Sequence, residues 1–198
     1  MKTLIVAAVK FEVENLLEEL EKKVYNFEFF EIGIGPLKAT RSSLKLEEKC
    51  ENAHVIYVGT CGTFSPFEKP YLVSAEETHW MPAGVRSGIS DFNPNWHPPL
   101  SFKEIPHSHK LQKEIILTSP EISLTQDFKN NEMTKNNSSR IYENMELYCV
   151  GEALKKSRRL DIILGVTNEI GPNSRLEWKK NFKKLAEMSK NYLLNLLL

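Results

Sequence analysis

The sequence has 198 residues, 41% of them hydrophobic and 26% charged, and its 26 basic and 26 acidic residues leave no net charge. These values are typical of one soluble globular domain covering residues 1–198. Zero net charge argues against a nucleic-acid-binding protein that works through a basic face, and no apolar run is long enough to cross a membrane. The three cysteines, Cys50, Cys61 and Cys149, lack metal-ligand spacing. They predict reduced thiols in a cytoplasmic protein, with no metal site.

The first half of the chain alternates between predicted strands and helices. Leu4–Val9 is an apolar run that predicts a buried strand. Apolar residues then recur at helical spacing and predict an amphipathic helix: Val13, Leu16, Leu17, Leu20 and Val24. Phe27–Ile34 predicts a second strand, which runs into a turn at Gly33–Gly35 and a helix that starts near Pro36. Further strands are expected at three places, the first of which leads into a glycine loop over Gly59–Thr63: Val55–Val58, Tyr71–Ser74 and Ile115–Thr118.

The second half contains two long segments that are expected to be loops. Residues 79–109 are rich in proline and aromatic residues and predict an ordered loop, whereas residues 126–140 are rich in Asn and Ser and predict a mobile surface loop. A helix over Met145–Lys155, a buried strand over Asp161–Val166 and a last helix that starts with the capping box Ser174–Glu177 complete the pattern. Strands that alternate with helices predict an α/β fold with helices on both faces of the sheet.

Several polar residues and glycines fall where predicted strands end, and ligands of α/β sheets bind at the carboxyl ends of strands. Glu12 follows the first strand, Asn168 follows the strand over Asp161–Val166, and Glu146 opens a helix. Each also has a purely structural explanation: the two glutamates as acids that favour a helix N-terminus, and Asn168 as a turn residue. The same holds for four glycines, which tight turns favour: Gly33, Gly35, Gly59 and Gly62.

The order of these motifs resembles that of the nucleoside phosphorylase and nucleosidase superfamily. The motifs are Val6–Val13 around Glu12, Gly33-Ile-Gly35, Val58–Thr63, Asn144-Met145-Glu146 and Val166–Asn168. The resemblance covers nearly the whole chain, although residues 79–140 match only in outline. It implies a three-layer α/β/α sandwich with a central mixed sheet, a homodimer, no cofactor and a small-molecule purine nucleoside as the ligand.

The resemblance also implies roles for particular residues. The first motif is similar to that of bacterial methylthioadenosine/adenosylhomocysteine nucleosidases, which implies that Glu12 is catalytic. The Met145-Glu146 pair implies that Glu146 binds the ribose hydroxyls. Thr60 and Gly62 are expected to join this pair in binding the substrate, with Thr60 positioning the ribose or a water.

Two departures from the superfamily pattern refine the expected subfamily. Related phosphorylases usually carry an Arg shortly before the glycine loop to hold phosphate, and Tyr57 at this position favours hydrolysis over phosphorolysis. Asn168 stands where adenosine-directed nucleosidases have Asp. The run Thr167–Trp178 is similar to that of futalosine hydrolases, which remove hypoxanthine from futalosine in an alternative route to menaquinone.

The predicted activity is therefore hydrolysis of the N-glycosidic bond of a purine nucleoside, with futalosine as the first choice of substrate. Glu12 is expected to take a proton from water, Glu146 to orient the sugar, and Asn168 to hydrogen-bond the base as charge develops on it. Trp80 and Phe128 are candidates for stacking or lid roles. Two alternatives stay open: a methylthioadenosine/adenosylhomocysteine nucleosidase with an altered base site, and a purine-nucleoside-binding protein without turnover.

Overall fold

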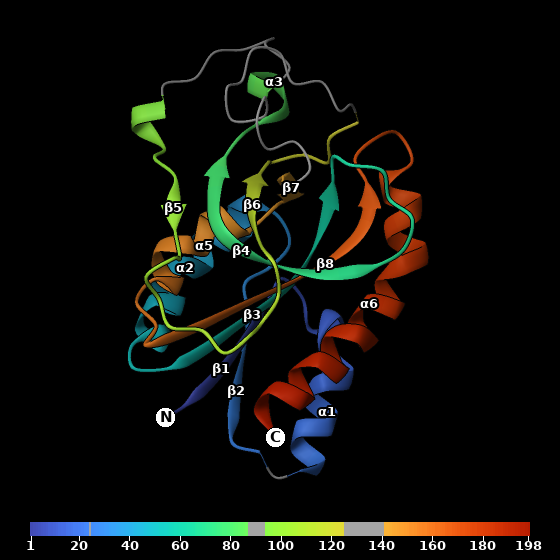
Figure 1. Ribbon diagram of the computed structural model, residues 1–198. Coiled ribbons are helices and arrows are strands. Elements are labelled where there is room, and N and C mark those ends of the chain that lie inside the picture. The colour runs from blue at the N-terminus through green and yellow to red at the C-terminus, as the bar shows by residue number, and fades with distance from the viewer. Residues whose placement is uncertain (24, 87–93, 125–140) are drawn as a thin grey trace.

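The computed structural model describes residues 1–23, 25–86, 94–124 and 141–198 (Figure 1). The first half contains β1 (Thr3–Ala7), η1 (Lys10–Glu12), α1 (Glu14–Lys22), β2 (Phe27–Glu31), α2 (Pro36–Cys50), β3 (His54–Thr63), β4 (Tyr71–Trp80) and α3 (Ala83–Arg86). The second half contains η2 (Pro94–Trp96), β5 (Leu100–Ser101), β6 (Lys113–Thr118), β7 (Ile141–Asn144), α5 (Leu147–Leu154), β8 (Arg159–Glu169) and α6 (Ser174–Leu197).

The strands form one mixed sheet that closes on itself. β1 pairs in parallel with β2 and β3, and β3 pairs in parallel with β8. β8 runs antiparallel to β4, which is parallel to β6, and β6 is parallel to β7. Because β7 returns to pair antiparallel with β3, five strands make a closed ring, and Figure 1 shows the strong curvature of β4 along it. The prediction of an α/β fold with a central mixed sheet is confirmed, whereas the three-layer sandwich is not, because the sheet is closed.

Helices cover the sheet on two sides, and the side chains of β1 point alternately toward one side and the other. α1 and α6 lie side by side (Figure 1) and pack on Ile5, Ala7 and the residues around them. α2 and α5 pack on the other side, against Leu4 and Val6. Successive side chains of a strand point to opposite faces, so a strand that is covered on both faces is apolar throughout. This confirms the prediction of a buried first strand.

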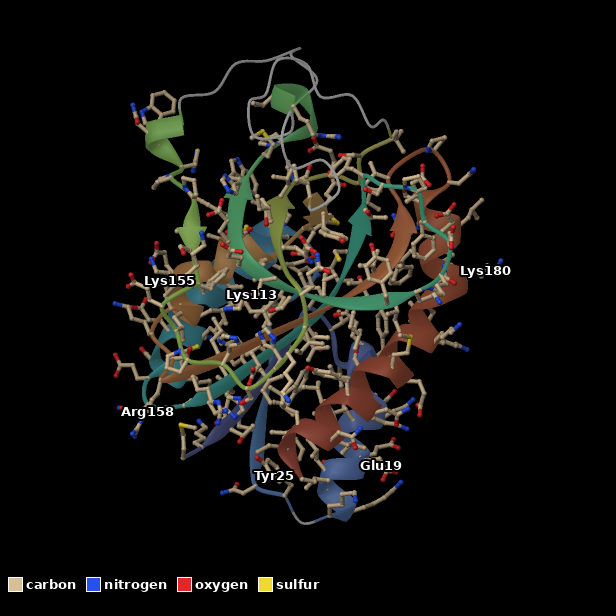
Figure 2. All side chains as sticks on the ribbon, in the orientation of Figure 1. Glu19, Tyr25, Lys113, Lys155, Arg158 and Lys180 are labelled. Carbon is tan, nitrogen blue, oxygen red and sulfur yellow. The ribbon has the colours of Figure 1, made fainter. Side chains whose placement is uncertain are left out.

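Many charged side chains lie on the surface. Figure 2 shows Lys155, Arg158 and Lys180 projecting from the periphery of the molecule, and all three are exposed. None of the helices in the described ranges combines the length and the apolar character that a membrane span requires.

The predicted glycine loop over Gly59–Thr63 is wrong, because these residues continue strand β3 to Thr63. They pair with the end of β8, which likewise runs past the predicted Val166 to Glu169, with a bulge between Cys61 and Gly62. A Cβ atom on Gly62 would clash with Ile170 Cδ1 and would lie 2.8 Å from Asn168 Nδ2. Glycine here leaves room for the Ile170 and Asn168 side chains and does not form a turn.

Other boundaries also differ from the prediction. Residues 79–109 are not one loop, since they include the end of β4, α3 and β5. The expected capping box is wrong, because Asn173 is the N-cap of α6 and Ser174 Oγ accepts the Gly171 N–H at 2.8 Å. The last helix does begin at Ser174 as predicted. The predictions for residues 126–140, for Phe128 and for Val24 lie outside the described residues.

Candidate active site

A cavity of about 360 Å³ lies at the carboxyl ends of the parallel strands β1, β3 and β8, where the sheet meets the start of α5 and of α6. All six of the predicted site residues line it: Glu12, Thr60, Gly62, Met145, Glu146 and Asn168. They come from four separate parts of the chain, and the topology of the sheet brings them together. The site expected from the motifs is thus one continuous cavity.

Glu12 lies in the short helix η1 directly after β1, with its carboxyl group inside the protein. Its Oε2 atom is buried and has no hydrogen-bond partner among the described residues. Burial, reinforced by the nearby Glu146 carboxylate, raises the pKa of Glu12 from its ordinary 4.5 to about 8, against the opposing effect of the Val9 and Ala8 backbone amides. A carboxyl group with this pKa is a much stronger base than an exposed one once it is ionised.

Glu146 is held by donors on both of its carboxylate oxygens. Oε1 accepts the Gly35 N–H at 2.8 Å, and Oε2 accepts Asn144 Nδ2 at 3.2 Å. Gly33 and Gly35 both have a positive φ, 84° and 82°, so this turn requires glycine in order to present its amide. Burial raises the pKa of Glu146, and these donors oppose the rise. The residue therefore presents a buried but hydrogen-bonded carboxylate to the cavity.

Asn168 presents a side-chain amide from the end of β8. Its Oδ1 accepts the Thr167 hydroxyl at 2.6 Å, and its Nδ2 donates to the Glu169 carbonyl at 3.0 Å. One lone pair and one hydrogen of the amide remain for a ligand. The neighbouring Glu169 does not line this cavity, and its Oε2 accepts the Phe67 N–H at 3.2 Å. Of these two residues, it is Asn168 that faces the cavity.

Thr60 is oriented by an aromatic side chain of α6. Trp178 Nε1–H donates to Thr60 Oγ1 at 3.1 Å, which leaves the threonine hydroxyl hydrogen available to the cavity. Trp178 stacks on Phe182 with 5.1 Å between ring centroids, and Phe11 meets Trp178 edge-on at 6.4 Å. Trp178 and Phe11 also line the cavity, so this aromatic cluster forms one of its walls.

Neither the protein-family models nor the curated protein sequences contain a match to the chain. Solved structures do match over its whole length. A methylthioadenosine/adenosylhomocysteine nucleosidase of Helicobacter pylori superposes with a TM-score of 0.73 at 13% identity, covering 99% of this chain and 97% of that one. Futalosine hydrolase of the same organism gives 0.72 at 12%, with the same coverage. The nucleosidase of Colwellia psychrerythraea in complex with adenine gives 0.71 at 16%, covering 100% and 94%.

The protein has the nucleosidase fold. The resemblance to the nucleoside phosphorylase and nucleosidase superfamily is thereby confirmed at the level of the fold. In this nucleosidase fold the cavity opens at the same carboxyl edge of the sheet where the sequence motifs were expected to meet.

Two cavity residues of this nucleosidase fold were not assigned a role from the sequence. Asn144 hydrogen-bonds both Glu146 and the Thr60 carbonyl. The only signal for it in the sequence is an Asn shortly before a predicted helix, although the N-cap of α5 is Glu146. Glu143 adds a further buried carboxylate, whose Oε1 accepts the Ser123 N–H at 3.0 Å. No local pattern marked Glu143, because its burial depends on pairing between β3, β6 and β7.

Two further residues, one aromatic and one sulfur-containing, are not assigned a role by the structure. Trp80 does not line the cavity and instead packs beside Tyr148, with 6.2 Å between ring centroids. Cys61 also lines the cavity, and burial raises the pKa of its thiol well above the ordinary value, so the structure disfavours a nucleophilic thiolate at this position. Within the described part of the chain, no three His, Cys, Asp or Glu side chains are grouped so as to hold a metal ion.

Proposed function

We propose that the protein hydrolyses the N-glycosidic bond of a purine nucleoside. The observation that carries this proposal is that the carboxyl groups of Glu12 and Glu146 meet the amide of Asn168 around one cavity, with Glu12 Oε2 and the Glu146 side chain buried. Similar folds support it, since the Colwellia nucleosidase holds adenine and a variant of the Helicobacter nucleosidase holds 5′-methylthioadenosine.

The proposed mechanism assigns one task to each polar group. Ionised Glu12 takes a proton from a water molecule, whose oxygen attacks C1′ of the ribose as the bond from C1′ to the base nitrogen breaks. With a pKa of about 8, Glu12 is mostly protonated at neutral pH, so the reactive carboxylate becomes the major form only above about pH 8. Glu146 accepts hydrogen bonds from the ribose hydroxyls and fixes the sugar, and Asn168 hydrogen-bonds the departing purine. The purine gains its replacement proton from solvent.

Water is the proposed nucleophile because the cavity is unsuited to phosphate. Tyr57, at the position where related phosphorylases carry an Arg, is buried, and its pKa is raised by burial and by the Glu146 and Glu12 carboxylates. It is a neutral phenol and offers no positive charge. The cavity walls carry the glutamates at positions 12, 143 and 146, and the basic residue that also lines the cavity, Arg175, is exposed in the first turn of α6. A phosphate dianion requires charge-assisted donors, which these acids do not supply.

The proposed substrate class is a 6-oxopurine nucleoside, with futalosine as the specific candidate and hypoxanthine as the released base. The Asn168 amide can donate to O6 and accept a hydrogen bond from N7–H, whereas a carboxylate would face the lone pairs of O6. Methylthioadenosine or adenosylhomocysteine is the second candidate, favoured by the similarity to nucleosidases of that specificity.

A substrate panel tests this function. The wild-type protein is incubated with futalosine, inosine and methylthioadenosine, with and without phosphate, and free base and sugar are separated by chromatography. We expect release of hypoxanthine with free sugar at a rate independent of phosphate. Faster cleavage of methylthioadenosine would assign the second candidate, and a sugar 1-phosphate product would contradict hydrolysis. Binding without any base release would leave a purine-nucleoside-binding protein.

We also propose that the protein acts as a homodimer. Large apolar side chains stand exposed on α2 and on the turn before it, with 84% exposure for Leu37, 75% for Leu44 and 54% for Ile34. A monomer gains nothing from such a stripe, and burying it against a second copy removes apolar surface from water. Light scattering on the purified protein should give twice the chain mass, and Leu37→Glu combined with Leu44→Glu should halve it. A wild-type monomer would contradict the proposal.

A further inference from the structure

We propose that Asn144 is a positioning residue for Glu146. Its side-chain amide locks the Glu146 carboxylate against the first turn of α5, so that the carboxylate meets the ribose in one orientation. The inference rests on the proposed nucleosidase function, and it adds a residue to which none of the sequence motifs gave a role.

The hydrogen bonds of Asn144 carry the inference. Its Oδ1 accepts the backbone N–H of Glu146 at 2.8 Å and that of Leu147 at 2.8 Å. Its Nδ2 donates to the Thr60 carbonyl at 2.9 Å and to Glu146 Oε2 at 3.2 Å. A side-chain amide has two acceptor lone pairs and two donor hydrogens, and these four bonds, with a further contact to the Tyr57 side chain, use all of its capacity. Asn144 is buried and has no hydrogen bond left for a substrate, and it therefore acts through Glu146.

The arrangement fixes Glu146 at three points. The backbone of Glu146 is tied to Asn144 Oδ1, one carboxylate oxygen is tied to Asn144 Nδ2, and the other is tied to the Gly35 amide. A buried carboxylate without donors would lose its charge or rotate toward another donor. The hydrogen bond from Asn144 to the Thr60 carbonyl connects Glu146 to β3, so Glu146 and Thr60 keep a fixed relative position.

A substitution can separate the role of the Asn144 amide oxygen from that of the amide nitrogen. Asn144→Asp keeps a side-chain oxygen that can accept the Glu146 and Leu147 N–H groups just before α5. It replaces the donor by a carboxylate oxygen that would face Glu146 Oε2 and the Thr60 carbonyl oxygen, now 3.2 Å and 2.9 Å away. Both contacts become repulsive. Asn191→Asp is the matched control, since Asn191 Nδ2 also faces a glutamate oxygen, Glu187 Oε1 at 3.4 Å, on the exposed side of α6.

The experiment measures kcat and KM for inosine and 2′-deoxyinosine, and records the Gly35 amide peak by NMR. Removing a hydrogen bond to a charged group should lower kcat/KM for inosine by roughly 10- to 100-fold in Asn144→Asp. The preference for inosine over 2′-deoxyinosine should fall by a similar factor, because a displaced Glu146 no longer reads the 2′-hydroxyl. The Gly35 peak should move, and Asn191→Asp should match the wild type in every measurement.

A purely structural role would lower thermal stability without changing the ribose preference. An unchanged preference together with an unchanged Gly35 peak in folded Asn144→Asp overturns the proposal. If Asn144→Asp does not fold, Asn144→Ser takes its place, because the serine hydroxyl oxygen can accept a backbone N–H but leaves Glu146 Oε2 without the amide donor. If the wild type cleaves no purine nucleoside, the proposed function fails, and the Gly35 peak alone then decides whether Asn144 positions Glu146.

Discussion

Replacing Glu12 by Gln should stabilise the protein at alkaline pH while it removes the proposed base. The pKa of Glu12 is about 8 in the folded protein and about 4.5 when the chain unfolds, so between these values the folded state keeps a proton that the unfolded state releases. The free energy of unfolding of the wild type therefore falls as pH rises from 4.5 to 8, by about 1.36 kcal/mol per pH unit. Over this interval the loss amounts to about 5 kcal/mol.

Glutamine does not titrate, so the variant is expected to lack this loss. Urea unfolding of both proteins at pH 5, 6, 7, 8 and 9 measures the effect. The difference in free energy should be small at pH 5, should grow in favour of the variant up to about pH 8, and should stay constant above it. Glu14→Gln, an exposed glutamate at the start of α1, controls for the loss of one carboxylate. If the free energies of unfolding of the wild type and of Glu12→Gln changed with pH in parallel, the argument from the burial of Glu12 would be refuted.

Three further substitutions test the electrostatics and the hydrogen bonds of the cavity. Glu146→Gln removes the negative neighbour that helps to raise the pKa of Glu12, so the acid limb of the pH profile of kcat/KM should move to lower pH than in the wild type. Asn168→Asp should raise the ratio of kcat/KM for adenosine to kcat/KM for inosine by about tenfold or more, since a mismatched buried polar pair costs about 1–3 kcal/mol. Trp178→Phe removes the donor to Thr60 and should lower kcat/KM by roughly 2- to 10-fold, measured with inosine. The first prediction fails if the acid limb does not move, the second if the base preference is unchanged, and the third if the rate is unchanged.

The local sequence was sufficient for the elements that lie in the core. Leu4–Val9 predicted a buried strand because both of its faces are covered, and the glycine turn at Gly33–Gly35 followed by Pro36 marked the start of α2. The same motifs named Glu12, Glu146 and Asn168, and the rule that ligands bind at the carboxyl ends of strands brought them to one edge of the sheet.

Long-range contacts explain what the sequence did not reveal. Gly59–Thr63 has the composition of a turn, and its pairing with β8 and β7 keeps it extended. The closure of the sheet depends on β7, four residues whose partners are distant in the chain. The roles of Asn144 and Trp178 depend on Thr60, which is 84 and 118 positions away from them. No local pattern encodes such pairings.

The central claim is that Glu12 activates water to release a purine base, and the rate of base release in wild type and Glu12→Gln tests it most directly. Both proteins are compared with saturating inosine or futalosine at pH 8, after circular dichroism has established equal folding. The account predicts a kcat about 10²- to 10⁴-fold lower in the variant, the loss that follows removal of a positioned general base. Equal rates in two folded proteins would contradict it.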